Sequence, residues 1–224
     1  MTSFALLGSP FLGPEVWAPV AEVLADRGHR VAVVVGRGHT PEEVTLQLLD
    51  GLPADDRLVL VPHSNAGLYV PALAAARPVG GAVFVDAGFP GPGRTTPVAP
   101  RELAERLAHE AGDDGLLPPW TQWWPEQETA ALFPDEKTRR AVEAGQPRVP
   151  ASYLLSRVAT PPGWETGLAA AYLAFGRTYD LETALAREWG WPVLVLRGGH
   201  LHQLVDPPGV AGALTDLVGA LGLD

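Results

Sequence analysis

The chain has 224 residues, of which 46% are hydrophobic, and its formal net charge is −10. This length and apolar content are enough for one sizeable core, so we expect residues 1–224 to form a single domain. The negative charge disfavours phosphate backbones and anionic membrane surfaces, so neither a nucleic acid nor a membrane is expected as a partner.

The sequence contains no cysteine, which excludes disulfides, thiolate metal sites and cysteine nucleophiles. A chain without cysteine fits a reducing compartment, so a cytoplasmic location is predicted. The first apolar run, "SFALLG", follows no basic stretch and ends at Gly8, which favours a strand over a signal peptide. No apolar stretch in the sequence approaches the roughly 20 residues that span a bilayer.

Apolar runs and amphipathic stretches alternate over the first 87 residues. Short valine- and leucine-rich runs bounded by Gly, Pro or charged residues predict strands. Stretches with apolar residues at helical spacing, one of them opened by the capping pair Thr40-Pro41, predict helices. The predicted elements are strand 3–8, helix 14–28, strand 29–35, helix 40–52, strand 56–62, helix 65–76 and strand 80–87.

The pattern changes after residue 87. Residues 88–147 are rich in Pro and Trp and lack strand patterns, although 100–112 and 134–145 are typical of helices. We predict that 88–147 form a lid over the sheet. The alternation then resumes with strand 148–156, a mostly helical stretch 164–189, strand 191–199 and helix 206–221.

Strands that alternate with helices and are apolar on both faces predict an α/β fold: a doubly wound parallel sheet with helices on both faces. The six predicted strands would form one sheet, with the lid inserted after the fourth. Ligands of such sheets bind at the carboxyl ends of the strands. Ser64, Asp86 and His200 are the polar residues at those ends.

Ser64 stands between a strand and a helix in "VPHSNAG". Pro62 and Ala66, two residues before and after it, are compact enough for a sharp turn that exposes the hydroxyl at the helix N-terminus. Such a turn suits a nucleophile, with the backbone N–H of Asn65 donating to a developing oxyanion. The alternative is that Ser64 only caps the helix. His63 is expected to point away from the site.

His200 lies just past the last predicted strand, after two glycines. A serine hydroxyl needs an adjacent base, and histidine suits this role because its unperturbed pKa is about 6.5. His202 is the rival in the same stretch. A His-x-His pair can also bind a metal, but no third ligand cluster accompanies it, so no metal site and no cofactor are expected.

Asp86 ends the fourth predicted strand in "VFVDAGFP". A buried carboxylate costs several kcal/mol unless it is paired, and an interaction that holds the tautomer of His200 would supply that partner. The alternative is that Asp86 caps the following turn.

The order of these features resembles the α/β-hydrolase superfamily over essentially the whole chain. The first strand with the Trp17 helix, the "HSNAG" turn, "AVFVDAGFP" and "GGHLHQLVDPP" follow one another as in that family. The short form, without two N-terminal strands, is similar to the plant methyl-esterase and hydroxynitrile-lyase branch. The resemblance implies strand order 2-1-3-4-5-6, with Ser64 as nucleophile, His200 as base and the Asn65 N–H as an oxyanion donor.

The resemblance leaves a choice of acid. In most members of the family it follows the fifth strand, but "SRVATPPGW" has no acid before Glu165. Some members, such as the haloalkane dehalogenases, place it after the fourth strand, and "VDAGFP" resembles that variant. Asp86 is therefore preferred to Glu165 and Asp180.

The loop after the first strand, Gly8-Ser9-Pro10-Phe11, departs from the family's His-Gly pattern. If Pro10 occupies the position of the second oxyanion donor, it has no N–H to give. The Phe11 N–H or the Ser9 hydroxyl would then substitute for it. One missing donor costs roughly 10²–10³ in the rate of acyl transfer.

The loops and the predicted lid bring bulky residues above the strand ends. We expect an apolar substrate pocket lined by Ser9, Leu12, Phe89, Trp120, Trp123 and Trp124. The alternative for the tryptophans is packing of the lid onto the body, which is expected for at least two of them.

The first functional hypothesis is a serine hydrolase that cleaves a small, mostly apolar carboxylic ester or thioester through an acyl-enzyme. The alternative is a non-hydrolytic enzyme of the same fold, a lyase, epimerase or cyclase of a small-molecule biosynthetic pathway. A binding protein without catalysis is disfavoured by the three polar residues at the strand ends. The expected partner is a small-molecule substrate, and the expected state is a monomer or homodimer.

Overall fold

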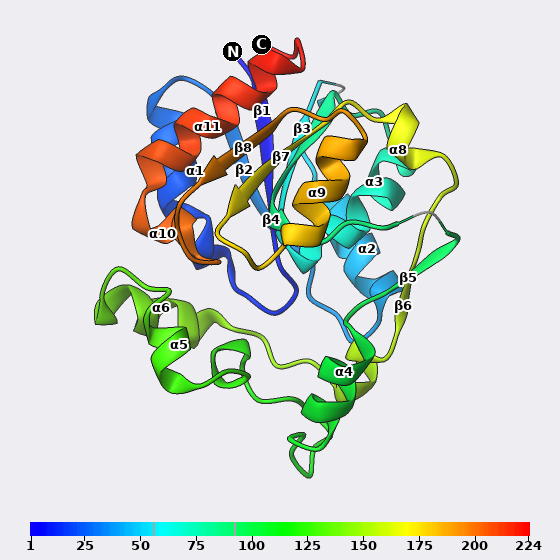
Figure 1. The fold of residues 1–224 in the computed structure, drawn as a ribbon, viewed down its shortest axis with the longest axis vertical. Helices are drawn as coiled ribbons and strands as arrows, with labels where there is room; N and C mark the ends of the chain where they lie inside the picture. Colours follow the sequence, from blue (N-terminus) through cyan, green and yellow to red (C-terminus); the bar gives the residue numbers. More distant parts are fainter. Residues whose placement is uncertain (56, 92) are drawn as a thin grey trace.

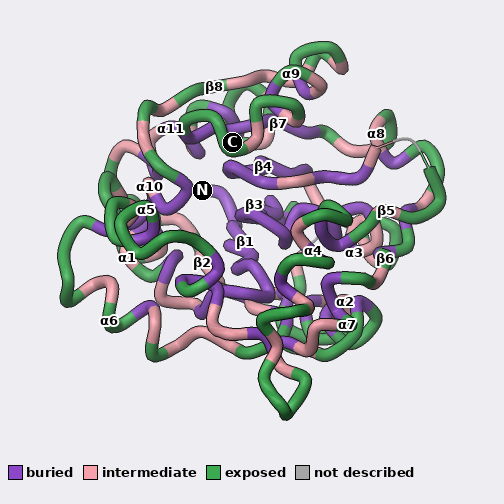
Figure 2. The backbone as a smooth tube through the Cα atoms, turned by 60° about the horizontal axis from the view of Figure 1, so that its bottom comes forward, coloured by how far each residue is buried: buried purple, intermediate pink, exposed green. Residues whose placement is uncertain are grey.

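A parallel sheet forms the centre of the molecule in a computed structural model that describes residues 1–55, 57–91 and 93–224. The order β2-β1-β3-β4-β7-β8 confirms the predicted order, with β7 and β8 as the fifth and sixth strands (Figure 1). The strands are β1 Ser3–Gly8, β2 Arg30–Val35, β3 Val59–Ser64, β4 Gly81–Ala87, β7 Ala170–Phe175 and β8 Val193–Leu196. Every residue of β1, β3, β4 and β7 is buried, as the purple strands of Figure 2 show.

Helices cover both faces of the sheet (Figure 1). One face carries α1 Ala18–Asp26 and α11 Pro207–Ala220, and the other carries α2 Pro41–Gly51, α3 Val70–Ala76 and α9 Asp180–Glu188. Thr40 caps α2 by accepting the Glu43 N–H at 3.2 Å, as the Thr-Pro pair predicted. The short helices η1 Pro14–Val16, η2 Asn65–Tyr69 and α10 His202–Val205 complete the body.

The fifth strand is not where the sequence predicted it. Residues 148–156, predicted as a strand, contain the short helix α7 Ala151–Leu154. The fifth strand of the sheet is β7, "AAYLAF", inside the stretch 164–189 that was predicted to be mostly helical. Alanine favours helices, but β7 lies between β4 and β8 and is buried on both faces, so its tertiary position overrides its local propensity.

Two predicted elements include residues outside the described part of the chain. Asp56 is the first residue of the predicted strand 56–62, and Pro92 belongs to the predicted lid 88–147. The described strand in the first case is β3, which begins at Val59.

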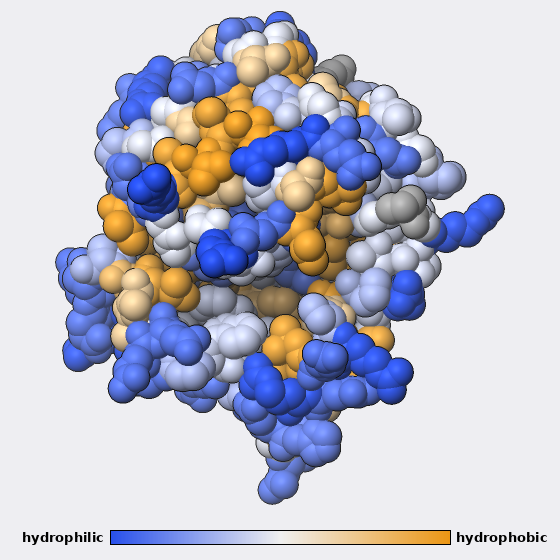
Figure 3. All heavy atoms as spheres, in the orientation of Figure 1, coloured by the Kyte–Doolittle hydropathy of each residue, from blue (hydrophilic) through white to orange (hydrophobic). Residues whose placement is uncertain are grey.

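We call residues 88–169, between β4 and β7, the inserted segment; it is longer than the predicted lid because β7 begins at Ala170. Most of it lies below the sheet in Figure 1, and the surface is hollowed between it and the body in Figure 3. It also contains an antiparallel pair, β5 Thr95–Pro97 with β6 Arg157–Ala159, and neither of these two strands was predicted. Its helices are α4 Arg101–Ala108, η3 Trp120–Gln122, α5 Glu126–Ala130, α6 Glu136–Gly145, α7, and α8 Trp164–Gly167.

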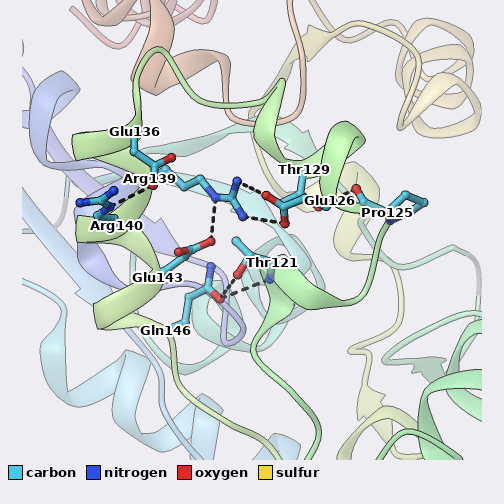
Figure 4. A network of polar contacts seen from close by, with 9 residues as sticks. All are labelled: Thr121, Pro125, Glu126, Thr129, Glu136, Arg139, Arg140, Glu143 and Gln146. Carbon is cyan, nitrogen blue, oxygen red and sulfur yellow. Dashed lines mark hydrogen bonds and ion pairs between the residues drawn. The ribbon is translucent and has the colours of Figure 1, made fainter.

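Charged side chains brace the inserted segment internally (Figure 4). The guanidinium of Arg139 on α6 binds both carboxylate oxygens of Glu126 on α5, with Nη2 2.8 Å from Oε2, and its Nε lies 2.8 Å from Glu143. Gln146, after α6, accepts hydrogen bonds from the N–H and hydroxyl of Thr121 at 3.3 and 3.1 Å. These contacts fix η3 and α5 against α6.

Candidate active site

Ser64 occupies a strained turn at the carboxyl end of β3. Its φ of 58° and ψ of −129° place a residue with a side chain in a region that L-residues rarely adopt. The turn is tight: a Cβ on Gly67 would lie 2.0 Å from the carbonyl oxygen of Gly88, so only glycine fits there. The Gly88 N–H donates to the Ser64 carbonyl at 3.2 Å. The strand-to-helix turn predicted for "VPHSNAG" is therefore present.

The structure brings Ser64, His200 and Asp86 into one hydrogen-bonded line. His200 Nε2 lies 3.1 Å from Ser64 Oγ, and His200 Nδ1 lies 2.6 Å from Asp86 Oδ2. The other carboxylate oxygen, Oδ1, accepts the backbone N–H of Phe175 at 2.9 Å. All three side chains are buried, with residue exposures of 5%, 7% and 1%. Since Asp86 binds Nδ1, His200 presents Nε2 to the serine as a proton acceptor.

The rival residues lie elsewhere. Asp180 is exposed and pairs with Arg177 at 3.3 Å, and Glu165 lies on α8 in the inserted segment. The ring of His202 packs against Phe175, with ring centroids 5.4 Å apart. None of the three has a hydrogen bond to Ser64 or His200 in the described part of the chain.

His63 contacts both the ring and the backbone of His200, so the expectation that it points away from the site is wrong. It is fully buried, its ring stacks on that of His200 with centroids 4.5 Å apart, and its Nε2–H donates to the His200 carbonyl at 2.9 Å. Burial, and then the neighbouring His200, hold the pKa of His63 well below its usual value, so the ring stays neutral. The alternating faces of a buried strand gave no indication of this contact.

Two tyrosines near the site were not identified from the sequence. The hydroxyl of Tyr179 lies 3.5 Å from Ser64 Oγ, and that of Tyr172 bridges the N–H and the carbonyl of Ala87 at 3.1 and 2.8 Å. Burial, reinforced by the charge of Asp86, raises both phenol pKa values, so both groups remain protonated donors. They were missed because Tyr172 lies on β7 and Tyr179 follows it, in a stretch predicted to be helical.

The loop after β1 is buried against the site. Ser9 and Leu12 are fully buried, Pro10 is buried, and none of the three lines the cavities described below. The Phe11 N–H lies 3.4 Å from Ser9 Oγ, a long hydrogen bond, and the Phe11 side chain lines the first cavity. Of the predicted loop residues, Phe11 alone among the described residues reaches the cavity.

The first cavity, of about 350 Å³, opens over Ser64 and His200. Its walls are mostly apolar and include all three predicted tryptophans: Trp120, Trp123 and Trp124. Trp120 and Trp123 are also packed, at 7% and 5% exposure, whereas Trp124 is 37% exposed. Trp120 and Trp123 therefore both line the cavity and pack in the interior, so the two alternatives for these residues apply at once.

A second cavity, of about 310 Å³, adjoins the first. Phe89, predicted to line the pocket, lies in this second cavity. The side chain of Asn65 stands between the two cavities and donates from Nδ2 to the Val98 carbonyl at 2.7 Å. The residue after Ser64 thereby holds the inserted segment in place.

Two further properties describe the site and its surroundings. Among the described residues, no Lys or Arg side chain lines either cavity, and no group of three His, Asp or Glu is arranged to hold a metal ion. Within residues 1–55, 57–91 and 93–224, no helix is both long enough and apolar enough to cross a membrane.

Comparisons with known proteins bear on the fold. No family model and no curated protein matches the sequence. An extracellular α/β-hydrolase from a Paenibacillus species, described as sharing structural and functional homology with tobacco salicylic acid binding protein 2, is 18% identical, with a TM-score of 0.76 over 97% of this chain and 99% of that one. Methylesterase MES16 from Arabidopsis is 16% identical, with a TM-score of 0.71 over 98% and 99%. Tomato methylketone synthase I, complexed with 2-tridecanone, is 15% identical, with a TM-score of 0.73 over 98% and 98%. With its sheet order and its serine turn after β3, this chain has the α/β-hydrolase fold.

Proposed function

We propose that the protein is a serine hydrolase in which Ser64 is the nucleophile, His200 the general base and Asp86 the residue that orients His200. The observation that carries this proposal is the line of contacts from Ser64 Oγ to His200 at 3.1 Å and from His200 to Asp86 at 2.6 Å. His200 takes the serine proton as Ser64 attacks the carbonyl carbon, then gives it to the leaving group. Water hydrolyses the resulting acyl-enzyme by the same relay.

The oxyanion would be held by backbone donors at the turn. We assign the Asn65 N–H, which follows the nucleophile, and the Phe11 N–H, whose contact to Ser9 Oγ is long at 3.4 Å and is exchanged for the stronger bond to an oxyanion. Pro10 contributes no donor but shapes the loop. Tyr179, 3.5 Å from Ser64 Oγ, is a further protonated donor at the same centre.

The substrate class follows from the walls of the first cavity. Three tryptophans and Phe11 give it an apolar, aromatic lining of a volume that suits a small acyl group. We therefore propose a small, mostly apolar carboxylic ester or thioester. Neighbours of this fold include a methylesterase, which supports an ester, although likeness at this identity extends to the fold alone.

Labelling with a fluorophosphonate probe tests the proposal directly. The wild-type protein should be labelled, and peptide mapping should place the label on Ser64. The Ser64→Ala variant should not react. Equal labelling of both proteins would overturn the assignment of Ser64.

The second candidate is a non-hydrolytic enzyme on the same fold, a lyase, epimerase or cyclase. The observation that favours it is the proline-bearing loop, because Pro10 lacks an N–H and Phe11 already contacts Ser9. His200 would then move a proton on a substrate held in the first cavity. A protein that binds ligands in this cavity but is inert to the probe, and hydrolyses no ester, would support this candidate.

The location and the assembly state belong to the same proposal. We expect a cytoplasmic protein that acts as a monomer or homodimer on a small molecule. Cell fractionation and light scattering at several concentrations measure these two properties.

A further inference from the structure

The second cavity contains an acidic side chain that the proposed reaction does not use. Glu182, on the first turn of α9, lines this cavity together with Thr96, Phe89 and the ring of Tyr179. The cavity shares five lining residues with the first one: Asn65, Val98, Ala99, Pro100 and Tyr179. The hydroxyl of Tyr179 lies 3.5 Å from Ser64 Oγ, and Tyr179 lines both cavities. Its side chain is therefore a wall that the two cavities share.

A structural role does not account for Glu182. An acid on the first turn of a helix normally gains from the helix dipole, which lowers its pKa. Here burial raises the pKa of Glu182 instead, by more than a hydrogen bond from its own backbone N–H lowers it, and the charge of Asp86 adds to the rise. No ion pair to its carboxylate occurs among the described residues, although it is half-buried. The fold therefore carries a carboxylate whose surroundings disfavour its charge, at the wall of a cavity.

Each of the two cavities is lined by one acidic side chain, Glu128 in the first and Glu182 in the second. The first cavity carries Glu128, which is exposed, and the described lining of both cavities contains no Lys or Arg. An anionic group in the second cavity would face the Glu182 carboxylate with no Lys or Arg among the described lining residues. A cation placed in the second cavity would supply the partner that Glu182 lacks.

We propose that the second cavity binds a protonated amine of the substrate, with the Glu182 carboxylate as its partner. The inference rests on the proposed function, because it assigns the two cavities to two parts of one ester. The part bound in the first cavity is apolar, and the part that reaches past Tyr179 carries the amine.

A matched pair of ligands tests this. 2-(Dimethylamino)ethyl phenylacetate is protonated at neutral pH, and 3-methylbutyl phenylacetate is its uncharged carbon isostere. Calorimetric binding to the Ser64→Ala variant keeps the esters intact. We expect the amine ester to bind about tenfold more tightly at low salt, with the difference falling as NaCl is added.

Two further variants, each in the Ser64→Ala background, locate the preference. Glu182→Gln should abolish it while leaving the affinity for the 3-methylbutyl ester unchanged, and Glu128→Gln should retain it. Glu182→Gln should melt no lower than its parent, because it removes a half-buried unpaired carboxylate. If Glu182→Gln does not fold, the salt dependence in the parent protein still decides whether a charge pair forms.

Equal affinity of the parent for the two esters would overturn the inference, as would a preference that survives Glu182→Gln or is insensitive to salt. These outcomes are separate from a failure of the proposed function. If Ser64→Ala hydrolysed both esters as the wild type does, Ser64 would not be the nucleophile, and the ratio of KM values for the two esters would then measure the preference for the amine.

Discussion

The sheet body and the inserted segment are built by different means. In the body, β1, β3, β4 and β7 are buried along their whole length. In the inserted segment the longest helix, α6, has 10 residues with only Val142 buried, and ion pairs such as Arg139 with Glu126 join its elements. The body holds Ser64, His200 and Asp86, the three residues of the proposed relay, whereas the segment supplies walls of the cavities. We therefore expect substitutions in the body to change the rate and those in the segment to change affinity.

The largest effect is expected for Ser64→Ala. Loss of the nucleophile should lower kcat by about 10⁴-fold or more, because triad residues act as a unit. The control is Ser152→Ala, on an exposed position of α7 in the inserted segment, which should keep wild-type kcat. Ester hydrolysis followed by stopped-flow and steady-state assays measures both. Comparable kcat for the two variants would show that Ser64 is not the nucleophile.

The next effect is expected for Asp86→Asn. This variant keeps an oxygen for the Phe175 N–H but loses the charge that orients His200, so kcat should fall about 10³–10⁴-fold. Asparagine also tolerates the φ of 40° at this position, so the fold should persist. Asp180→Asn is the matched control, since Asp180 is exposed at the start of α9 and pairs with Arg177. A large loss of kcat in Asp180→Asn, with Asp86→Asn still active, would show that Asp180 and not Asp86 is the acid that orients His200.

The sequence predicted the body better than the inserted segment for a physical reason. β-Branched residues favour strands, so the valine-rich run of β2 was recognisable from its local composition, although only Val34 in it is buried. The alanine-rich β7 is a strand only because β4 and β8 flank it, and that information is not local. In 148–156 the apolar residues instead pack a short helix, with Tyr153 hydrogen-bonded to Tyr69.

The difference between local pattern and tertiary position also explains which site residues could be predicted from the sequence. Ser64, Asp86 and His200 follow recognisable strands, so the structure brings together three residues that the pattern had already selected. Tyr179 and Glu182 follow the strand that was missed, so their place beside the cavities was missed as well. Ser9 and Leu12 were expected to line the pocket but are fully buried, because loop position alone does not determine which side chains face inward.

The buried His63 in the sheet body should also make the stability of the protein depend on pH. Because the folded state keeps His63 neutral, the unfolded chain takes up the extra proton below pH 6.5, the usual pKa of histidine. Stability should therefore fall as pH falls below 6.5, by up to about 1.4 kcal/mol per pH unit, with no contribution above it. Urea unfolding at several pH values should show that the free energy of unfolding of His63→Gln depends less steeply on pH below 6.5 than that of the wild type.

If the free energy of unfolding of His63→Gln depended on pH as steeply as that of the wild type, His63 would be protonated within the folded body. Its Nδ1 has no hydrogen-bond partner among the described residues, so that proton would be buried without an acceptor. The stability measurement is therefore a direct test of how His63 lies beneath His200.

The smallest effect is expected in the brace of the inserted segment. Arg139 is 15% exposed and joins α6 to α5, which places Thr129 and Glu128 at the first cavity. Arg139→Gln leaves Glu126 and Glu143 without this partner, so α5 should loosen, KM should rise about threefold, and kcat should stay unchanged. Arg140→Gln is the control, because Arg140 is 75% exposed and binds only Glu136 among the described residues. Limited proteolysis should cut Arg139→Gln faster within residues 118–147 and leave Arg140→Gln like the wild type. A fall in kcat with unchanged KM would instead show that Arg139 affects the reaction at Ser64. The expected division, in which the body sets the rate and the inserted segment sets the affinity, would then be wrong.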